Sequence, residues 1–582
     1  MRAGGSPGSV ARRRQTAARL VPFAATLGAI AFAGGLVCGA LHTSAADHVA
    51  KSFAAAWRSG DYPAMYAVLS PDARRRTSLE HFVAAYRADR DIATARRMAI
   101  GEPVSHGSAY RLPVVVDTRV FGTVDDDVVL PIDDSGGHPS IDWRPHVAFP
   151  GLRAGEALTR RTRMPPRAAL LTRDRTPLAQ GPARSSPLGP LAASVVGVLG
   201  PAPPERSERL EALGVPAGTR VGVTGLERIF DERLLGRPGG ELLAGGRVLG
   251  RGVARAAGAV RTTISAPVQQ AAVTALAGRL GGTVALKPRT GEILAFAGIA
   301  FSGLQPPGST FKMITVTAAL ESHLTSPAKA YPVQTQAVLE GVTLQNANGE
   351  SCGGTLVESF AKSCNSVFAP MGAEIGAKRL VAVAERFGFN HDLGIPGAAT
   401  STIPTAGEIG DALAVGSSAI GQGRVQATAL QMAIVAATIG LRGRRPSPTL
   451  DFDAARGRAV AAKATDARTA RTVERLMLAV VAGGTGTAAA IPGVPVAGKT
   501  GTAELKTTTT CRPVPADPGA CPPAQTASDP TDTDAWFAAY APAGKGRPRI
   551  AVGVMLVGSG AGGATAAPAA RGLLIAGLKA SQ

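Results

Sequence analysis

The longest uncharged apolar stretch of this chain lies near its start, from Leu20 to Leu41. As a helix its 22 residues would be about 33 Å long, which is enough to cross a bilayer. Basic residues precede it, namely Arg12, Arg13, Arg14 and Arg19. This flank predicts a basic cytoplasmic tail over residues 1–19, a single transmembrane anchor over 20–41 in the cell membrane, and an extracytoplasmic location for the rest.

Two other interpretations of this stretch stay open. A cleaved signal peptide would use Ser44-Ala45-Ala46 as its cleavage site, although the apolar core of such a peptide is usually shorter. Cys38 could carry a lipid, but Gly35-Leu36-Val37 before it fits a lipid-attachment motif poorly. We therefore expect a retained anchor.

Residues 46–150 show helical periodicity first and strand periodicity afterwards. One helical face has apolar residues at i, i+4, i+7 and i+8, namely Val49, Phe53, Ala56 and Trp57. Thr77 and Glu80 have the spacing of a capping box for another helix, whose expected inner face is Leu79, Phe82, Val83 and Tyr86. Strand-like runs follow at 112–116 and 128–132, and a last one passes through Trp143. This order predicts a small α+β cone with a curved antiparallel sheet.

The rest of the chain divides into two units. Residues 151–262 are rich in Pro, Gly and Arg and predict an irregular β-rich domain. In residues 263–582, strands are expected at 283–286, 291–296, 496–504, 535–540 and 550–557, and helices at 309–320, 358–380, 427–438, 471–481 and from 567 onward. Strands at both ends of a helical middle predict one antiparallel sheet flanked by helices. The whole chain is thus expected to be a multidomain α+β protein.

Length and charge limit the partners that the chain can have. Its 582 residues are too many for one core and predict three or four domains. The net charge of +20 suggests an anionic neighbour. The basic residues are scattered, without a nucleic-acid-binding signature, and the predicted export also excludes nucleic acid. A membrane or an anionic envelope polymer is the expected partner, unless the charge serves only solvation.

Three short polar motifs carry the candidate chemistry. They are Ser309-Thr-Phe-Lys312, Ser363-Cys-Asn365 and Lys499-Thr-Gly501. Pro307 and Gly308 before the first motif are a helix-entry signal, and Lys312 follows Ser309 by about one helical turn. A second quartet, from Ser326 to Lys329, has a proline directly after its serine and no comparable helix to carry its lysine.

The first motif predicts a nucleophile and its base. A serine hydroxyl is a weak nucleophile and needs an adjacent base. No histidine is placed to pair with Ser309, so Lys312 is the available base, provided that it is neutral when it acts. Burial, the helix dipole and a second cation, for which Lys499 is the candidate, all disfavour the charged form of Lys312.

In this order, the three motifs resemble those of penicillin-binding proteins and class A β-lactamases. The similarity to penicillin-binding transpeptidases continues at 420–423, 430–432, 484–486 and 497–504. Residues 221–239 are similar to the pedestal of class B penicillin-binding proteins, and 53–62 with 142–152 resemble an NTF2-like domain. The chain is therefore similar to an actinobacterial class B penicillin-binding protein. The resemblance implies an NTF2-like domain at 46–150, a pedestal or dimerisation-type domain at 151–262 and a transpeptidase domain with the penicillin-binding/β-lactamase-like fold at 263–582.

This resemblance implies a D,D-transpeptidase that cross-links peptidoglycan stem peptides. Ser309 would be acylated by the D-Ala-D-Ala end of one peptide, D-alanine would leave, and the amine of another peptide would resolve the ester. Penicillin and other β-lactams would be trapped on the same serine. Ser363 would relay a proton to the departing amine, and Asn365 would bind the substrate amide. Proteins of the cell-wall synthesis complex are further expected partners.

The resemblance also gives roles to the third motif. Lys499, Thr500 and Thr502 would hold the carboxylate of the substrate, and Gly501 would let an edge strand lie close to it. The backbone N–H groups of Ser309 and Thr502 would form the oxyanion hole. No metal, nucleotide or other cofactor is implied.

Departures from the family pattern do not favour another function. Lys287, Ala429 and Asp534 stand where Asp, Pro and His are common in the family, but none lies in the three motifs, so an inactive homologue is not expected. Class A β-lactamases have Asp where this chain has Cys364. A β-lactam or muropeptide sensor would have only the short cytoplasmic tail as its output domain. A glycosyltransferase activity is not expected, because no second unit of catalytic size precedes the pedestal.

The five cysteines allow two exported disulfides. Cys511 and Cys521 bracket a Pro-rich segment and are expected to pair. Cys352 and Cys364 are the other candidate pair, which would tether the loop carrying the second motif. The alternative is that Cys364 is a free buried thiol.

Overall fold

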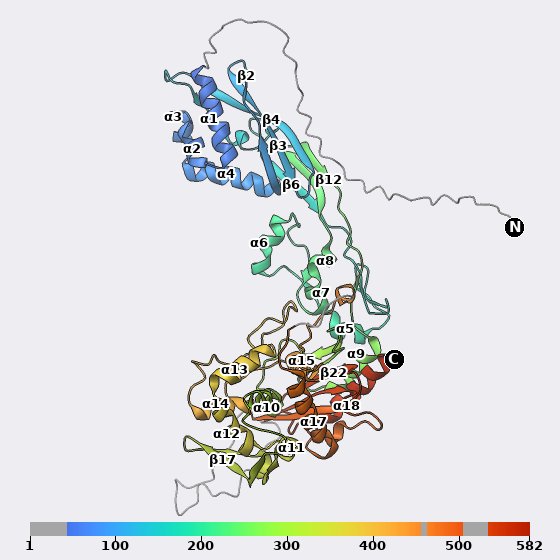
Figure 1. Ribbon diagram of the computed structural model, residues 1–582. Helices are drawn as coiled ribbons and strands as arrows, with labels where there is room; N and C mark the ends of the chain where they lie inside the picture. The colour runs from blue at the N-terminus through green and yellow to red at the C-terminus, as the bar shows by residue number, and fades with distance from the viewer. Residues whose placement is uncertain (1–43, 456–461, 505–532, 582) are drawn as a thin grey trace, which may run out of the picture.

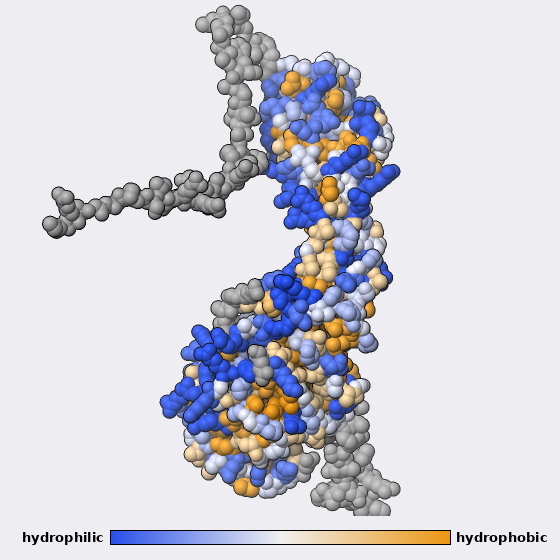
Figure 2. Space-filling model, turned by 90° about the vertical axis from the view of Figure 1, so that its right-hand side faces the viewer, coloured by the Kyte–Doolittle hydropathy of each residue, from blue (hydrophilic) through white to orange (hydrophobic). Residues whose placement is uncertain are grey.

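The computed structural model describes residues 44–455, 462–504 and 533–581. Figures 1 and 2 show two lobes joined by a narrow waist. The predicted anchor at 20–41 and the predicted Cys511–Cys521 disulfide lie outside the described residues. Within the described ranges, no helix is both long enough and apolar enough to span a bilayer.

The N-terminal lobe packs four helices against a five-stranded antiparallel sheet, as the α+β prediction required. The helices are α1 (Ala45–Ser59), α2 (Tyr62–Ala67), α3 (Pro71–Arg76) and α4 (Leu79–Ile92). The strands are β1 (Ala95–Ile100), β2 (Val104–His106), β3 (Ala109–Thr118), β4 (Thr123–Asp133) and β5 (Ser140–Ile141). Phe53, Phe82 and Tyr86 are fully buried between the two layers.

Two local predictions in this lobe are wrong. The N-cap of α4 is Ser78, which accepts a hydrogen bond from the backbone N–H of His81, whereas Thr77 follows the end of α3. The predicted N-cap, Thr77, is therefore one residue before the actual N-cap, Ser78. The last strand ends at Ile141, and Trp143 packs against Phe82 and Tyr86 of α4 and donates its indole N–H to the Tyr86 hydroxyl at 3.2 Å.

The pedestal is divided between the two lobes. Its upper sheet consists of β6 (Leu158–Arg163), β11 (Gly239–Ala244) and β12 (Arg247–Gly252), and buries Leu158 and Leu242 in the core of the N-terminal lobe. Its lower part shares a core with the C-terminal lobe and contains β7 (Leu170–Leu171), β8 (Pro177–Ala179), α5 (Pro190–Val196), α7 (Gly225–Ile229) and β13 (Val260–Arg261). Between them lie β9 (Leu199–Gly200), α6 (Pro204–Ala212), β10 (Val221–Gly222) and α8 (Asp231–Leu235). The hydrophobic continuity is therefore interrupted within the pedestal, at the waist.

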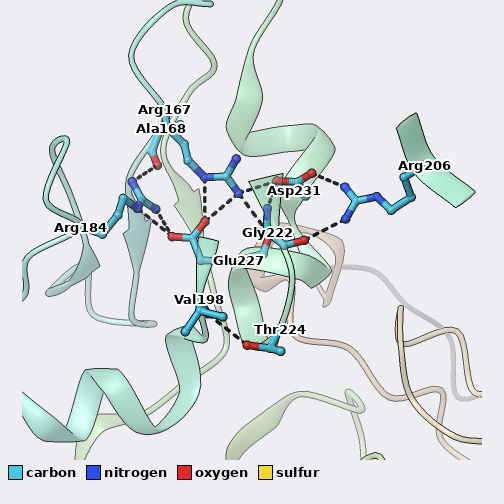
Figure 3. Close-up of polar contacts among 9 residues, drawn as sticks. All are labelled: Arg167, Ala168, Arg184, Val198, Arg206, Gly222, Thr224, Glu227 and Asp231. Atoms are coloured by element: carbon cyan, nitrogen blue, oxygen red, sulfur yellow. Dashed lines mark hydrogen bonds and ion pairs between the residues drawn. The ribbon is translucent and has the colours of Figure 1, made fainter. Parts of the chain in front are cut away.

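A buried ionic cluster joins the lower pedestal to the elements of the waist (Figure 3). Glu227 accepts hydrogen bonds from Arg167 and Arg184, each at 2.7 Å. Asp231 pairs with Arg167 and Arg206 and accepts a hydrogen bond from the backbone N–H of Gly222 at 2.7 Å. Both carboxylates are almost completely buried. Because three arginines contact them, their burial is compensated, and the cluster connects residues that are far apart in the sequence.

We expect Glu227→Ala to destabilise the pedestal by about 3 kcal/mol or more, because it leaves Arg167 and Arg184 buried without their main counter-ion. Glu232→Ala is the matched control, since Glu232 pairs with Arg209 on the surface, where both side chains are exposed. We expect that change to cost about 0.5 kcal/mol or less. Urea denaturation of both variants checks this, and equal losses would contradict the structural role of the cluster.

The C-terminal lobe confirms the predicted antiparallel sheet between helices. Its strand order is β15-β14-β22-β21-β20. The strands are β14 (Gly281–Leu286), β15 (Ile293–Gly298), β20 (Ala497–Glu504), β21 (Thr533–Ala541) and β22 (Ile550–Leu556). Helices α9 (Ala266–Leu276) and α18 (Ala566–Ala580) cover one face, and α10 (Lys312–Glu321), α15 (Ala429–Gly440) and α17 (Ala467–Gly483) lie on the side of the active-site motifs.

The predicted helix at 358–380 is three helices, so that prediction is wrong in its continuity. They are α11 (Leu356–Ala361), α12 (Asn365–Ile375) and α13 (Ala377–Arg386). Ser363 has a φ of 65° and Gly376 a φ of 79°, and neither conformation continues a right-handed helix. The first break places the Ser363 turn beside α10. Helix α14 (Ala412–Ala419) packs against α12. A hairpin of β17 (Gln336–Leu339) and β18 (Val342–Gln345), and the pair β16 (Ala330–Gln334) and β19 (Cys352–Thr355), lie next to α12.

Candidate active site

Ser309 lies on a short 3₁₀ turn, Gly308–Phe311, that leads directly into α10. Its side chain is half-buried. The turn is held by a hydrogen bond from the Gly308 N–H to the Gly421 carbonyl at 2.9 Å. Gly308 has a φ of 50°, and a Cβ there would lie 2.7 Å from the carbonyl oxygen of Thr502. Glycine at this position therefore allows the serine turn to lie directly against strand β20.

Lys312 brings the first two motifs together. Its side chain is fully buried, and its Nζ donates to Asn365 Oδ1 and to the Ser363 carbonyl, both at 2.7 Å. Its distance to Ser363 Oγ is longer, 3.4 Å. A neutral amine has two hydrogens and one lone pair. The two short contacts use both hydrogens, which leaves the lone pair to accept a proton.

Lys499 connects the third motif to the same serine. Its Nζ donates to Ser363 Oγ at 2.8 Å and to the Thr500 carbonyl at 3.1 Å. The side chains of Lys312, Ser363, Asn365 and Lys499 thus form one connected group, and Ser309 lies at its edge on the turn before Lys312. Residues separated by as many as 190 positions meet here because α10, the Ser363 turn and β20 pack together.

Burial lowers the pKa of both lysines, and a neighbouring charge adds to this effect at Lys312. Burial, and secondarily the charge of Lys499, lowers the pKa of Lys312 well below its usual value. Burial lowers the pKa of Lys499 to about 7. A lowered pKa favours the neutral form of Lys312, and a neutral amine near a serine can act as a general base.

The second motif is held by contacts that the motif itself does not reveal. Asn365 donates through Nδ2 to the Gln345 carbonyl at 2.8 Å. Asn346 accepts from the Ser366 N–H at 2.8 Å and donates to two further carbonyls, which fixes the start of α12. Cys352 and Cys364 form a disulfide that joins β19 to the Ser363 turn. Sequence reasoning did not find Asn346; its only signal is the turn-forming run Asn-Ala-Asn-Gly that it begins.

The third motif lies on β20, which pairs with β21 on one side only in the part of the chain that the structure describes. A Cβ on Gly501 would lie 2.7 Å from the Pro307 carbonyl oxygen and 2.9 Å from Trp536 Cβ, so a side chain there would push the strand away from the serine turn. Thr500 Oγ1 is 2.6 Å from Thr485 Oγ1, and Thr502 is half-exposed. An edge strand with accessible backbone groups can bind an extended peptide.

The second Ser-x-x-Lys quartet and the unusual family positions lie away from this group. Ser326 and Lys329 are exposed in a loop, and Lys329 donates to the Leu324 carbonyl at 2.7 Å. Lys287 pairs with Glu292 at 3.5 Å. Asp534 is buried opposite Ala503 and accepts from the Gly558 N–H at 2.9 Å, and burial raises the pKa of its carboxyl. None of the three unusual positions contacts the motif side chains through a described hydrogen bond or ion pair.

Comparison with known families agrees with this geometry. The penicillin binding protein transpeptidase domain family matches residues 281–574. The penicillin-binding protein dimerisation domain matches residues 176–252, and the NTF2-like N-terminal transpeptidase domain matches residues 45–156. The three matches correspond, in this order, to the C-terminal lobe, the pedestal and the N-terminal lobe.

Named relatives and solved structures show the same similarity. The chain is 34% identical over 430 residues to the peptidoglycan D,D-transpeptidase PbpA of Mycolicibacterium smegmatis, covering 61% of this chain and 80% of that protein. It is 32% identical over 411 residues to the protein of the same name in Mycobacterium tuberculosis, covering 60% and 77%. The crystal structure of PBPA from M. tuberculosis superposes with a TM-score of 0.52 at 27% identity, covering 71% of this chain and 99% of that one.

A further structure of that protein is its penicillin G acyl-enzyme complex, with a TM-score of 0.53 at 27% identity, covering 71% of this chain and 99% of the other. The M. tuberculosis protein thus combines the same fold with covalent capture of a β-lactam. With half of its length matched by the family and with Lys312 of the first motif and Lys499 of the third both bound to Ser363 of the second, this chain belongs to the penicillin-binding protein transpeptidase family.

Proposed function

We propose that this chain is a serine-type peptidoglycan D,D-transpeptidase that works through an acyl-enzyme on Ser309. The observation that carries the proposal is the buried Lys312 amine, which donates both hydrogens to the Ser363 turn and Asn365 and lies one turn after Ser309. Its substrate is the D-Ala-D-Ala end of a stem peptide. A β-lactam resembles that end and inhibits by acylating the same oxygen.

Acylation uses the first two motifs. Lys312 accepts the Ser309 proton as the serine Oγ attacks the carbonyl carbon of the penultimate D-alanine. The backbone N–H groups of Ser309 and Thr502 stabilise the oxyanion, and one such donor is typically worth about 3 kcal/mol. Collapse of the tetrahedral intermediate breaks the peptide bond. The proton passes through Ser363 to the nitrogen of the departing D-alanine, while Asn365 binds the amide of the peptide.

The third motif positions the donor. In this assignment, the charged Lys499, with the Thr500 and Thr502 hydroxyls, binds the terminal carboxylate, and the strand around Gly501 pairs with the peptide backbone. The amine of a second stem peptide then attacks the ester, loses a proton to the same base and releases Ser309 with a new amide bond. This second step consumes an amine rather than water, and it defines a transpeptidase.

The other domains position the catalytic lobe. We assign residues 20–41 as a single-pass anchor with a cytoplasmic N-terminus, so that residues 46–582 lie outside the membrane. In this arrangement the NTF2-like lobe at 46–150 is a spacer, the pedestal at 151–262 is a platform for cell-wall synthesis proteins, and residues 263–582 are the transpeptidase domain.

The experiment that tests the function follows the fate of a fluorescent penicillin adduct and of a thioester donor peptide with and without an acceptor D-amino acid. We expect an adduct that persists for many minutes, and a donor product that carries the acceptor amine. Loss of the label within seconds, with free acid as the main peptide product, would instead identify a hydrolase of the β-lactamase type.

A further inference from the structure

A strongly basic cleft lies in the C-terminal lobe, away from Ser309. Its volume is about 1320 Å³, and its walls come from the C-terminal end of α10, the end of α13, the beginning of α17 and the loop after β21. Glu321, which lines it, lies nine residues after Lys312 on α10, about 14 Å along the helix axis. None of the motif residues lines this cleft.

The acidic residues of the cleft are already engaged. Glu321 pairs with Arg386 and accepts from Thr465 Oγ1 at 2.6 Å. Glu474 pairs with Arg442 and accepts from the Gly544 N–H at 2.7 Å. The third acid, Asp466, caps α17 by accepting from backbone N–H groups of its first turn.

Five basic residues of the cleft have no described ion pair, namely Lys463, Arg468, Arg471, Arg475 and Lys545. All five are exposed. Arg468, Arg471 and Arg475 follow at i, i+3 and i+7, so they share one face of α17, about 4.5 and 6 Å apart along its axis. Like charges at this spacing repel one another, and an anion bound between them would remove that repulsion.

We propose that this cleft binds a linear polyanion that carries phosphate groups. Arginine presents a planar fork of donors that matches the oxygens of a phosphate, and most of the basic residues here are arginines. Hydroxyl groups of Thr325, Ser326 and Thr472 supply further polar lining. A cleft of this size has room for several phosphate groups, and its recessed position between helices favours a soluble chain over a flat membrane surface.

The lining favours this ligand over an acidic peptide. Peptide recognition commonly relies on apolar pockets for side chains. In this cleft the apolar residues are limited to Leu320, Pro327 and Ala464, apart from a glycine, whereas charged and hydroxyl side chains and His323 make up the rest. A hydrophilic phosphate polymer needs no apolar pocket and gains most from closely spaced arginines.

Calorimetric titration of the full-length chain in a neutral detergent with inorganic tripolyphosphate tests the proposal. The test variant carries Arg468→Gln, Arg471→Gln and Arg475→Gln. The control variant carries Arg289→Gln, Arg379→Gln and Arg571→Gln, which removes the same charge from exposed positions outside the cleft. We expect binding to weaken about tenfold or more in the test variant and to stay within about twofold of wild type in the control.

Two results would overturn the proposal. Equal weakening in both variants, or none in either, would mean that tripolyphosphate responds only to the net charge of the chain or binds elsewhere. Poly-L-glutamate that binds as tightly as tripolyphosphate, and loses affinity in the same variant, would make the cleft an acidic-peptide site. Penicillin labelling of both variants at the wild-type rate shows that the lobe is folded, and it separates this test from that of the transpeptidase activity.

Discussion

Ser309→Ala is expected to abolish covalent capture of penicillin, because no other hydroxyl in the described structure combines a position on the turn directly before α10 with the buried Lys312 and the edge strand β20. Removing the nucleophile of a serine enzyme typically costs about 10⁶-fold in rate. The variant should therefore show no adduct in a fluorescent-penicillin gel, and intact mass analysis should show the unmodified chain even after long incubation.

Ser326→Ala is the matched control for this change. It removes the serine of the second Ser-x-x-Lys quartet, which lies exposed in a loop whose lysine is bound to the Leu324 carbonyl. We expect wild-type labelling from this variant. Labelling that survives Ser309→Ala but disappears in Ser326→Ala would reverse the assignment of the nucleophile.

The sequence predicted the parts of the site that depend on short-range order. Ser309 and Lys312 are one turn apart, and this spacing alone places them together. The third motif could be placed on a strand because small and β-branched residues from 496 to 504 have strand character, and the structure has β20 at Ala497–Glu504. The order of strands and helices was also sufficient to predict the antiparallel sheet of the catalytic lobe.

The parts that could not be predicted depend on contacts between distant residues. The helical pattern at 358–380 is locally continuous, yet the chain breaks at Ser363, whose positive φ is maintained by packing against Lys312 and Lys499. Asn346 supports the second motif from a neighbouring loop, and Thr485 contacts Thr500 from the end of α17. None of these contacts has a periodic signature.

The division of the pedestal between the two lobes could not be predicted either, because it also depends on contacts between distant residues. A boundary near residue 150 follows from the change in composition, but Leu158 and Leu242 are buried in the N-terminal lobe, and Arg160 donates to the Asp91 carbonyl at 2.9 Å. Such a core is assembled from strands about 80 residues apart, and composition does not report which lobe they join.

Lys312→Met is expected to lower the rate of penicillin acylation by about 10³-fold, within the usual range of 10²–10⁴ for loss of a general base. Methionine has a similar length and is compatible with the buried position of this side chain. It removes the cost of burying an amine but leaves Asn365 Oδ1 and the Ser363 carbonyl without this donor, so the two effects oppose each other and the thermal midpoint should change little. Stopped-flow acylation and thermal denaturation of the same preparation separate a catalytic loss from misfolding.

The pH dependence of acylation distinguishes a base from a residue that only fills space. Lys312 must be neutral, so the rate should rise with pH through its pKa, and this limb lies below the usual lysine range because burial and the charge of Lys499 lower that pKa. Lys499→Gln removes the neighbouring charge, which raises the pKa of Lys312 and should move the limb to higher pH. Lys499→Arg keeps a charge there and should leave the limb near its wild-type position. The contradicting result is that the two variants weaken acylation equally at every pH and that neither moves the limb. In that case Lys499 acts only on the substrate carboxylate, and its charge does not set the protonation of Lys312.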